Sequence, residues 1–176
     1  MLASPVPRPA RLRTRRGRPI SISRAGPGDA EALAAMLGAL SPETVARRYL
    51  TPGAMHPERA RAEAERLARP DAGRIVLVAR AGGEAAPIVA VGELARAGAE
   101  PAVAEGAIVV ADAYQREGIG RAVAGHMADA ARDAAVSAVR ATVLAENTPV
   151  RRLIASLGRP YTLRHWRGEL LVEIAV

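Results

Sequence analysis

Apolar residues recur along this chain with the periods that strands and helices require. The β-branched run at 74–80 and the segments 87–95 and 103–111 predict three consecutive strands. Glycine-containing turns at 81–84 and 98–101 separate these segments. Short turns of this kind join neighbouring strands, so we expect the three strands to pair antiparallel.

Helical spacing of apolar residues marks five further segments. Asp29 is a candidate N-cap for the first helix, and Ser41 followed by Pro42 starts the second. Ser accepts a backbone hydrogen bond at that position, and Pro suits the first helical turn. Gly158 ends the last helix. The predicted helices cover residues 30–40, 42–50, 57–69, 118–135 and 149–157.

Four other short segments, 18–25, 139–145, 161–164 and 169–175, are predicted to be strands. The complete order places antiparallel strands first and one strand–helix–strand unit, residues 103–145, in the middle. The two strands of that unit should run parallel. We therefore expect a single α/β (α+β) domain with a mixed, mostly antiparallel sheet flanked by helices.

The net charge of +7 comes from the N-terminal end. Six arginines and no acid lie in residues 1–18, and the remaining 19 arginines face 18 acids. Pro5, Pro7 and Pro9 oppose an amphipathic helix there. We expect residues 1–18 to be a disordered basic tail and residues 19–176 to be the folded domain. Because that domain is nearly neutral, nucleic acid is not the expected partner.

The composition excludes several classes of function. The chain has no Cys, which removes disulfides, thiolate metal sites and Cys nucleophiles. Its three His are not at metal-ligand spacing, so we expect no metal. No apolar run approaches the roughly 20 residues needed to span a bilayer, and the N-terminus lacks the apolar segment of a secretory signal. We expect a cytoplasmic protein without a membrane partner.

The segment from Val109 to Ala122 carries the clearest chemistry. A strand ends near Ala111, and a short connection containing Gly118 and Gly120 leads into a helix. Free amides at a helix start attract phosphate, and glycine lets the phosphate approach closely. The P-loop pattern is absent, and the Rossmann fingerprint lacks its third glycine. These features indicate a pyrophosphate site.

Three motifs then resemble one family. Residues 115–120, Gln-Arg-Glu-Gly-Ile-Gly, match the Gln/Arg-x-x-Gly-x-Gly/Ala motif of the Gcn5-related N-acetyltransferases (GNAT), whose order of elements is also similar. Asn147, at the start of a helix, resembles the second cofactor segment of that family. Residues 40–49 resemble a Leu-Ser-Pro-Glu-Ser…Arg-Tyr/Phe segment in the branch that includes bacterial protein lysine acetyltransferases.

The resemblance implies that the chain binds coenzyme A, with acetyl-CoA as co-substrate. Backbone groups of Val109 and Val110 would hold the pantetheine arm where the parallel strands splay apart. Asn147 would contact that arm or a water beside it, and Arg48 and Tyr49 would line the acceptor side. The pyrophosphate would be held by the backbone amides of the loop residues Gln115, Arg116, Glu117, Gly118, Ile119, Gly120 and Arg121.

The same resemblance assigns proton transfer to two residues. Related lysine acetyltransferases carry a glutamate at the position of Glu105, and strand alternation puts Glu105 on one face with Ala107 and Val109. Glu105 would act as general base; a solvated glutamate at a strand end is the alternative. Tyr161 would protonate the thiolate. However, Leu-Gly-Arg-Pro-Tyr departs from the Leu-Gly-Phe/Tyr of the family, so packing of Tyr161 in the core is the alternative.

We therefore predict an acetyl-CoA-dependent N-acetyltransferase that transfers acetyl directly to a primary amine. The acceptor is a protein lysine or a small-molecule amine. One alternative is a non-catalytic module that binds and senses acyl-CoA. Another is a nucleic-acid-binding protein that acts through the basic tail, whose binding would depend steeply on salt.

Overall fold

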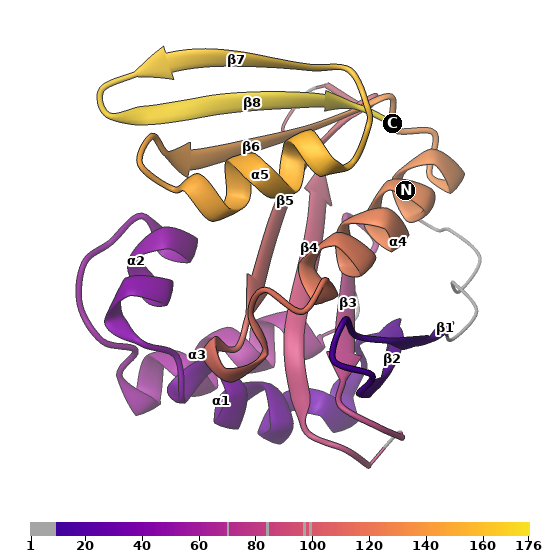
Figure 1. Ribbon diagram of the computed structural model, residues 1–176, viewed down its shortest axis with the longest axis vertical. Helices are drawn as coiled ribbons and strands as arrows, with labels where there is room; N and C mark the ends of the chain where they lie inside the picture. The colour runs from indigo at the N-terminus through magenta and orange to yellow at the C-terminus, as the bar shows by residue number, and fades with distance from the viewer. Residues whose placement is uncertain (1–9, 70, 84, 97, 99) are drawn as a thin grey trace.

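In the computed structural model, the described residues are 10–69, 71–83, 85–96, 98 and 100–176. Within these residues, eight strands form one sheet in the order β1-β2-β3-β4-β5-β6-β8-β7 (Figure 1). The strands are β1 (Ala10–Arg13), β2 (Pro19–Arg24), β3 (Arg74–Arg80), β4 (Ile88–Arg96), β5 (Val103–Val110), β6 (Ala138–Leu144), β7 (Tyr161–Trp166) and β8 (Glu169–Ala175).

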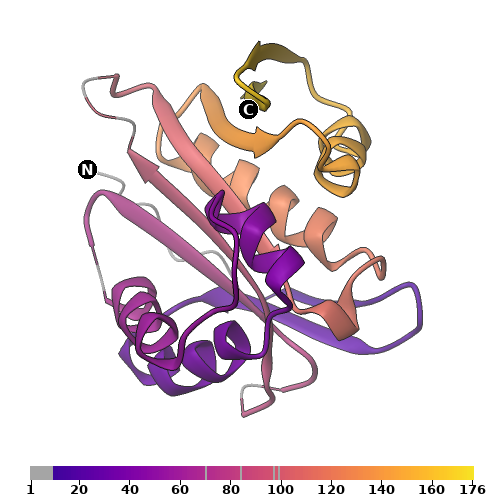
Figure 2. The ribbon, with the colours of Figure 1, turned by 90° about the vertical axis from the view of Figure 1, so that its left-hand side faces the viewer.

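Helices cover both faces of the sheet. Helices α1 and α3 pack against each other on one face, and α4 crosses β3, β4 and β5 on the other (Figures 1 and 2). Helix α2 lies over β5 and β6, on the same side of the sheet as α1 and α3 (Figure 2). The helices are α1 (Ala30–Gly38), α2 (Pro42–Tyr49), α3 (Pro57–Ala68), α4 (Ile119–Asp133) and α5 (Thr148–Ser156), with short 3-10 turns η1 (Pro27–Asp29) and η2 (Asp112–Tyr114).

Three apolar clusters hold these layers together. One joins α4 to the sheet, where Val123 and Met127 pack over Gly92 of β4. A Cβ at Gly92 would come within 2.5 Å of the Met127 sulfur, so glycine permits this close approach. The second cluster joins α1 and α3 to the opposite face, and the third joins α5 to β6 and β8. The core is therefore built from aliphatic side chains on both faces of one sheet.

The predicted fold class is confirmed. The described residues form a single mixed sheet, mostly antiparallel, in which β5 and β6 run parallel and are joined by α4. Each predicted helix and strand has a counterpart within a few residues of its expected bounds. The order of the last strands was not predicted, because β8 lies between β6 and β7 and pairs with both.

The predicted tail boundary is wrong for residues 10–18. Ala10–Arg13 forms β1 and pairs antiparallel with β2, for example Arg11 with Ser21 and Leu12 with Ile20. Leu12 remains 38% exposed, so this strand is held by backbone pairing rather than by apolar burial. That is why hydrophobic patterning did not reveal it. The rest of the predicted tail, residues 1–9, lies outside the described residues.

Two features of the described part of the chain concern membranes and metals. None of its helices is both long enough and apolar enough to cross a bilayer. None of its groups of three or more His, Asp or Glu side chains is arranged to bind a metal ion.

Candidate active site

A gap opens between the two parallel strands of the sheet. β5 and β6 pair only over Val103–Glu105 and Ala138–Arg140, after which β6 continues beside β8 alone. A cavity of about 960 Å³ occupies this gap. Residues 106–110 of β5 and 141–143 of β6 line it, together with side chains of α2, α4 and α5. The predicted splay of the strand–helix–strand unit is therefore present.

The edge of β5 offers unpaired backbone groups to this gap. The Ala111 N–H donates to the Val89 carbonyl on β4 at 2.8 Å, so alternation turns the Val109 N–H and C=O toward β4 as well. The backbone groups of Ile108 and Val110 point the other way, toward the gap. Of the two residues expected to hold the pantetheine arm, Val110 is suitably oriented and Val109 is not. Sequence reasoning missed Ile108, although strand alternation could have identified it.

The connection from β5 to α4 gathers amide groups at the mouth of the gap. Arg116 (φ 61°) and Gly118 (φ 89°) adopt left-handed conformations on either side of Glu117. Gly118 is the N-cap of α4, so the first N–H groups of that helix have no helical partner. Alternating backbone conformations of this kind form concave anion sites, and the helix dipole adds to the attraction. The turn therefore has the geometry expected of a phosphate site.

Side chains of the same turn serve different purposes. Arg116 and Arg121 are exposed and line the cavity, as does Gly120. Ile119 is only 3% exposed and packs in the core, so it can offer a ligand only its backbone amide. Glu117 is buried and faces away from the cavity, toward Arg16 and Arg18 of the β1–β2 connection. Glu117 and Ile119 can therefore offer a ligand only their backbone amides, which is the kind of contact expected of residues 115–121.

Gln115 and Asp112 connect this turn to α2. The Gln115 side-chain N–H donates to the Thr44 hydroxyl and to the Val110 carbonyl, each at 3.1 Å. Asp112 accepts from the Ser41 N–H at 3.0 Å and from the hydroxyls of Ser41 and Thr44 at 2.7 Å. Partial burial raises the pKa of Asp112, but these hydrogen bonds outweigh it and hold the pKa below its usual value. The Gln115 side chain therefore links the turn to α2 and β5 instead of pointing to a phosphate.

Asn147 lies across the gap from this turn. It is the N-cap of α5, its side-chain oxygen accepts the Val150 N–H at 3.3 Å, and it lines the cavity while only 6% exposed. Among the described residues, its side-chain NH₂ has no hydrogen-bond partner. Asn147 therefore has a free N–H donor at the cavity surface.

The two residues expected on the acceptor side occupy different environments. Arg48 lines the cavity, and its guanidinium donates to Glu93 at 3.1 Å. Tyr49 packs against the α1–α3 core instead, with the guanidinium groups of Arg48 and Arg59 at 4.9 Å and 5.0 Å from its ring centre. Burial raises the pKa of Tyr49 to about 12. Arg48 therefore lines the cavity, whereas Tyr49 lies outside the lining and packs against the core.

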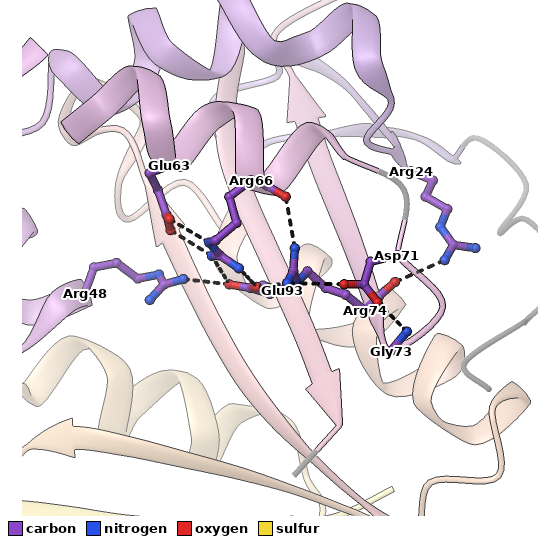
Figure 3. A network of polar contacts seen from close by, with 8 residues as sticks. All are labelled: Arg24, Arg48, Glu63, Arg66, Asp71, Gly73, Arg74 and Glu93. Atoms are coloured by element: carbon purple, nitrogen blue, oxygen red, sulfur yellow. Dashed lines mark hydrogen bonds and ion pairs between the residues drawn. The ribbon is translucent and has the colours of Figure 1, made fainter. Parts of the chain in front are cut away.

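Glu93, which sequence reasoning did not single out, anchors this region (Figure 3). It lies on β4, is 8% exposed, and receives two hydrogen bonds from Arg66 at 2.5 and 2.9 Å. Arg48 and Arg74 add ion pairs at 3.1 and 3.2 Å. Burial raises the pKa of Glu93, but the three arginines outweigh it and lower the pKa below its usual value. Glu93 therefore stays ionised and holds Arg48 in place.

Glu105 lies where the gap begins. It is the last residue of β5 that pairs with β6, opposite Arg140, and its side chain is exposed on the α2 face of the sheet. Within the described residues no hydrogen bond or ion pair reaches its carboxylate. Gly106, the next residue, lines the cavity, whereas Glu105 stands just outside the lining. Its register also makes it a diagonal neighbour of Glu93, since Ala95 pairs with Glu105 and Glu93 with Ala107.

Tyr161 does not reach the cavity. It lies on the edge strand β7, is 43% exposed, and pairs with Ile174 of β8, which does line the cavity. The insertion of β8 between β6 and β7 places Tyr161 one strand beyond the wall of the site. Neither the expected acid role nor the alternative of core packing fits this exposed position.

A comparison with protein-family models identifies one family. A family model described as the Acetyltransferase (GNAT) family matches residues 42–158. The search of curated protein sequences found no match.

Solved structures share the fold. The GNAT domain of PAT from S. lividans is 24% identical, with a TM-score of 0.82 over 96% of this chain and 97% of that domain. A cAMP-binding acyltransferase from Mycobacterium smegmatis is 26% identical, with a TM-score of 0.64 over 97% of this chain and 48% of that protein, so this chain spans about half its length. Spermidine N-acetyltransferase from Vibrio cholerae, solved with CoA and spermine, is 11% identical, with a TM-score of 0.66 over 89% of this chain and 94% of that one. This chain belongs to the GNAT acetyltransferase family.

Proposed function

We propose that this protein transfers the acetyl group of acetyl-CoA directly to a primary amine, with Glu105 as general base. One observation carries the proposal. The gap between β5 and β6 leads from the amide-rich turn at the start of α4, past the backbone of Ile108 and the Val110 N–H, to Gly106, which adjoins Glu105 where the strands meet. A long cofactor with phosphate at one end and a reactive group at the other matches that path.

The residues of the cavity fit coenzyme A along its length. Arg116 and Arg121 provide positive charge beside the turn, which suits phosphate. The pantetheine arm carries amide groups, and amides can pair with exposed backbone as an added strand would. Ile108, Val110 and the NH₂ of Asn147 are placed for such pairing. Acetyl-CoA bound this way supplies an activated acetyl group as a thioester.

Glu105 would perform the proton chemistry at the far end of the path. The acceptor must attack as a neutral amine, and Glu105 holds the proton that its nitrogen loses, directly or through water. As the nitrogen–carbon bond forms, the carbon–sulfur bond breaks, and water in the open gap protonates the displaced sulfur. Glu93 is unsuited to this role because three arginines already neutralise it.

The test compares two carboxylate variants. Glu105→Gln should lower kcat by roughly 10²- to 10³-fold while the Kd for acetyl-CoA stays unchanged, measured by thiol release and by calorimetry. Glu43→Gln is the matched control, because Glu43 also lines the cavity but is ion-paired with Arg47 at 2.5 Å. Full turnover by Glu105→Gln would remove Glu105 from the mechanism.

We further propose a protein lysine as the acceptor. Glu105 is exposed on the α2 face of the gap, where a lysine on another protein can reach it. Seven arginines but a single acidic side chain, that of Glu43, lie among the described residues that line the cavity, so a polycationic amine would be repelled. A panel of protein lysines, simple amines and polyamines should show turnover with proteins first. Preference for a polyamine would contradict this assignment.

One observation favours a second candidate function, an acyl-CoA-binding module without catalysis. Tyr161, the expected acid, lies outside the cavity. A sensing module would bind acetyl-CoA tightly, yet no acceptor in the panel would increase thiol release above the rate without acceptor. Release stimulated by any amine excludes this candidate.

A further inference from the structure

The connection between β1 and β2 forms a compact arginine-bearing tip, residues 14–18. The Thr14 N–H donates to the Arg18 carbonyl and the Gly17 N–H donates to the Thr14 carbonyl, both at 2.9 Å. The buried Thr14 hydroxyl accepts the N–H groups of Arg16 and Arg18 at 3.2 Å. These bonds make the tip a defined turn.

This tip rests against the turn that precedes α4. The Arg15 N–H donates to the Glu117 carbonyl at 2.9 Å, and an added Cβ on Gly118 would lie 3.8 Å from the Arg15 Cγ. The Arg18 guanidinium lies over the Tyr114 ring at 5.1 Å. The hairpin and the amide-rich turn therefore form adjoining walls of one end of the cavity.

Glu117 sits between these two walls as a buried anion. Its side chain is 1% exposed, and neither carboxylate oxygen has a hydrogen-bond partner among the described residues. Its nearest charges are Arg16 at 3.6 Å and Arg18 at 3.8 Å, both on the hairpin. An anion so poorly hydrogen-bonded is retained in the interior only where nearby positive charge compensates it. Glu117 thus ties the hairpin tip to the turn electrostatically.

The arginines of the hairpin tip and of the adjoining end of β1 have different contacts. Arg13 donates to the Gly17 carbonyl at 2.8 Å, and Arg16 and Arg18 face Glu117. The Arg15 guanidinium has no hydrogen-bond or ion-pair partner in the described part of the chain, and Arg15 lines the cavity. It shares that end of the cavity with the exposed Arg116 and Arg121.

We propose that Arg15 binds a phosphate group of the CoA nucleotide and that Glu117 is the positioning residue that holds the hairpin for this contact. The inference rests on the proposed function, since it presumes that acetyl-CoA occupies the cavity. It adds an N-terminal element to the phosphate site. Guanidinium groups bind phosphate through paired, charge-assisted hydrogen bonds, and Arg15 is the hairpin arginine placed to make them.

The experiment measures cofactor binding rather than turnover. Arg15→Gln should weaken the Kd for acetyl-CoA about 10-fold in calorimetry. Arg11→Gln, the same charge change on exposed β1 outside the cavity, should leave it unchanged. The same comparison is then made with 3′-dephospho-acetyl-CoA. If Arg15→Gln still binds this ligand more weakly than wild type does, Arg15 contacts the pyrophosphate. If the two proteins bind it equally well, Arg15 contacts the 3′-phosphate. Either result supports the proposal.

Binding by the wild-type protein distinguishes failure of this inference from failure of the proposed function. If wild-type protein binds acetyl-CoA and Arg15→Gln binds it equally well, the role of Arg15 is wrong while the proposed function stands. If wild-type protein does not bind acetyl-CoA, the proposed function itself fails.

A double-mutant cycle tests Glu117. Glu117→Gln should weaken acetyl-CoA binding several-fold in the wild-type background and have no further effect in the Arg15→Gln background, because it acts through Arg15. Equal losses in both backgrounds would show a general structural role and overturn the positioning role. Circular dichroism of each variant confirms that it is folded before binding is compared.

Discussion

Gly118 and Gly120 belong to one motif, yet the backbone needs them for different reasons. Gly118 has a φ of 89°, in the left-handed region, which an L side chain adopts only with strain. Gly120 is helical, and a Cβ there would lie 3.6 Å from Val110 and 3.8 Å from Leu153, which are ordinary contacts. At the residue scale, Gly118 is needed for its left-handed backbone conformation, whereas Gly120 leaves space beside the cavity.

Matched alanine variants should separate these roles. Gly118→Ala should lower the free energy of unfolding by about 1–2 kcal/mol, because left-handed backbone is strained for alanine. It should also weaken acetyl-CoA binding, since the turn must shift. Gly120→Ala should unfold at or above the wild-type denaturant midpoint. Equal stabilities of the two variants would contradict the assigned conformational role of Gly118.

A second residue-scale prediction concerns Tyr161. Because its side chain lies on the exposed edge strand and outside the cavity, Tyr161→Phe should leave kcat within about 2-fold of wild type, whereas a general acid typically contributes 10²-fold or more. Steady-state thiol release at saturating acetyl-CoA measures this. A large loss in kcat would mean that β7 rearranges when the cofactor binds.

At the scale of elements, α2 and the turn before α4 act as one unit. Ser41 caps α2 by accepting the Thr44 N–H at 3.2 Å, and it also donates its own hydroxyl to Asp112 at the start of the turn. The Ser-Pro-Glu segment that suggested an acceptor helix therefore has a structural reason as well. Helix α2 carries Arg48 into the cavity, so two parts of the cavity lining, α2 and the turn before α4, are held together.

Removing this connection should affect both elements. Ser41→Ala should lower the free energy of unfolding by about 1 kcal/mol through loss of the cap, with urea denaturation as the measurement. It should also raise KM for both substrates. Ser23→Ala is the control, because no hydrogen bond of the Ser23 hydroxyl is found within the described residues. A change in stability without any change in KM would argue against coupling of α2 to the turn.

At the scale of the whole molecule, Glu93 joins α2, α3, β3 and β4. Its arginine partners come from positions 48, 66 and 74, and Arg74 also donates to the Arg66 carbonyl at 3.0 Å (Figure 3). Breaking a buried ion pair on one side leaves the other charges uncompensated, which is strongly destabilising. This network links the helical layer to the centre of the sheet.

Glu93→Gln should therefore lower the free energy of unfolding by about 3 kcal/mol at pH 7. Because the pKa of Glu93 is lowered on folding from its usual 4.5, its contribution is complete above that pH and is lost as the pH falls through the lower folded value. The stability of wild type should thus decline on acidification below about pH 4.5, and the variant should lose less there. Denaturation at several pH values measures both curves. If the free energy of unfolding falls equally with pH in wild type and in Glu93→Gln, the ionised Glu93 carboxylate does not stabilise the fold.

Several parts of this arrangement could be read from the sequence. Local periodicity located each helix and all strands but β1, since period and turn residues act over short ranges. The Gly118–Gly120 turn and the Asn147 cap were predictable because each uses neighbouring backbone. β1 was missed because its pairing with β2 involves little apolar burial. Glu93 left one faint signal, a lone acid in an otherwise apolar strand.

The amino-acid sequence by itself determined the order of elements, the strand–helix–strand unit and the turn at its centre, because propensities and caps are local properties. Only the tertiary structure decided what depends on distant segments meeting. It placed β8 between β6 and β7 and so moved Tyr161 away from the cavity. It gathered three arginines around Glu93, and it laid the Arg15 hairpin against the turn before α4. Such contacts follow from the packing of the whole chain, which no local pattern encodes.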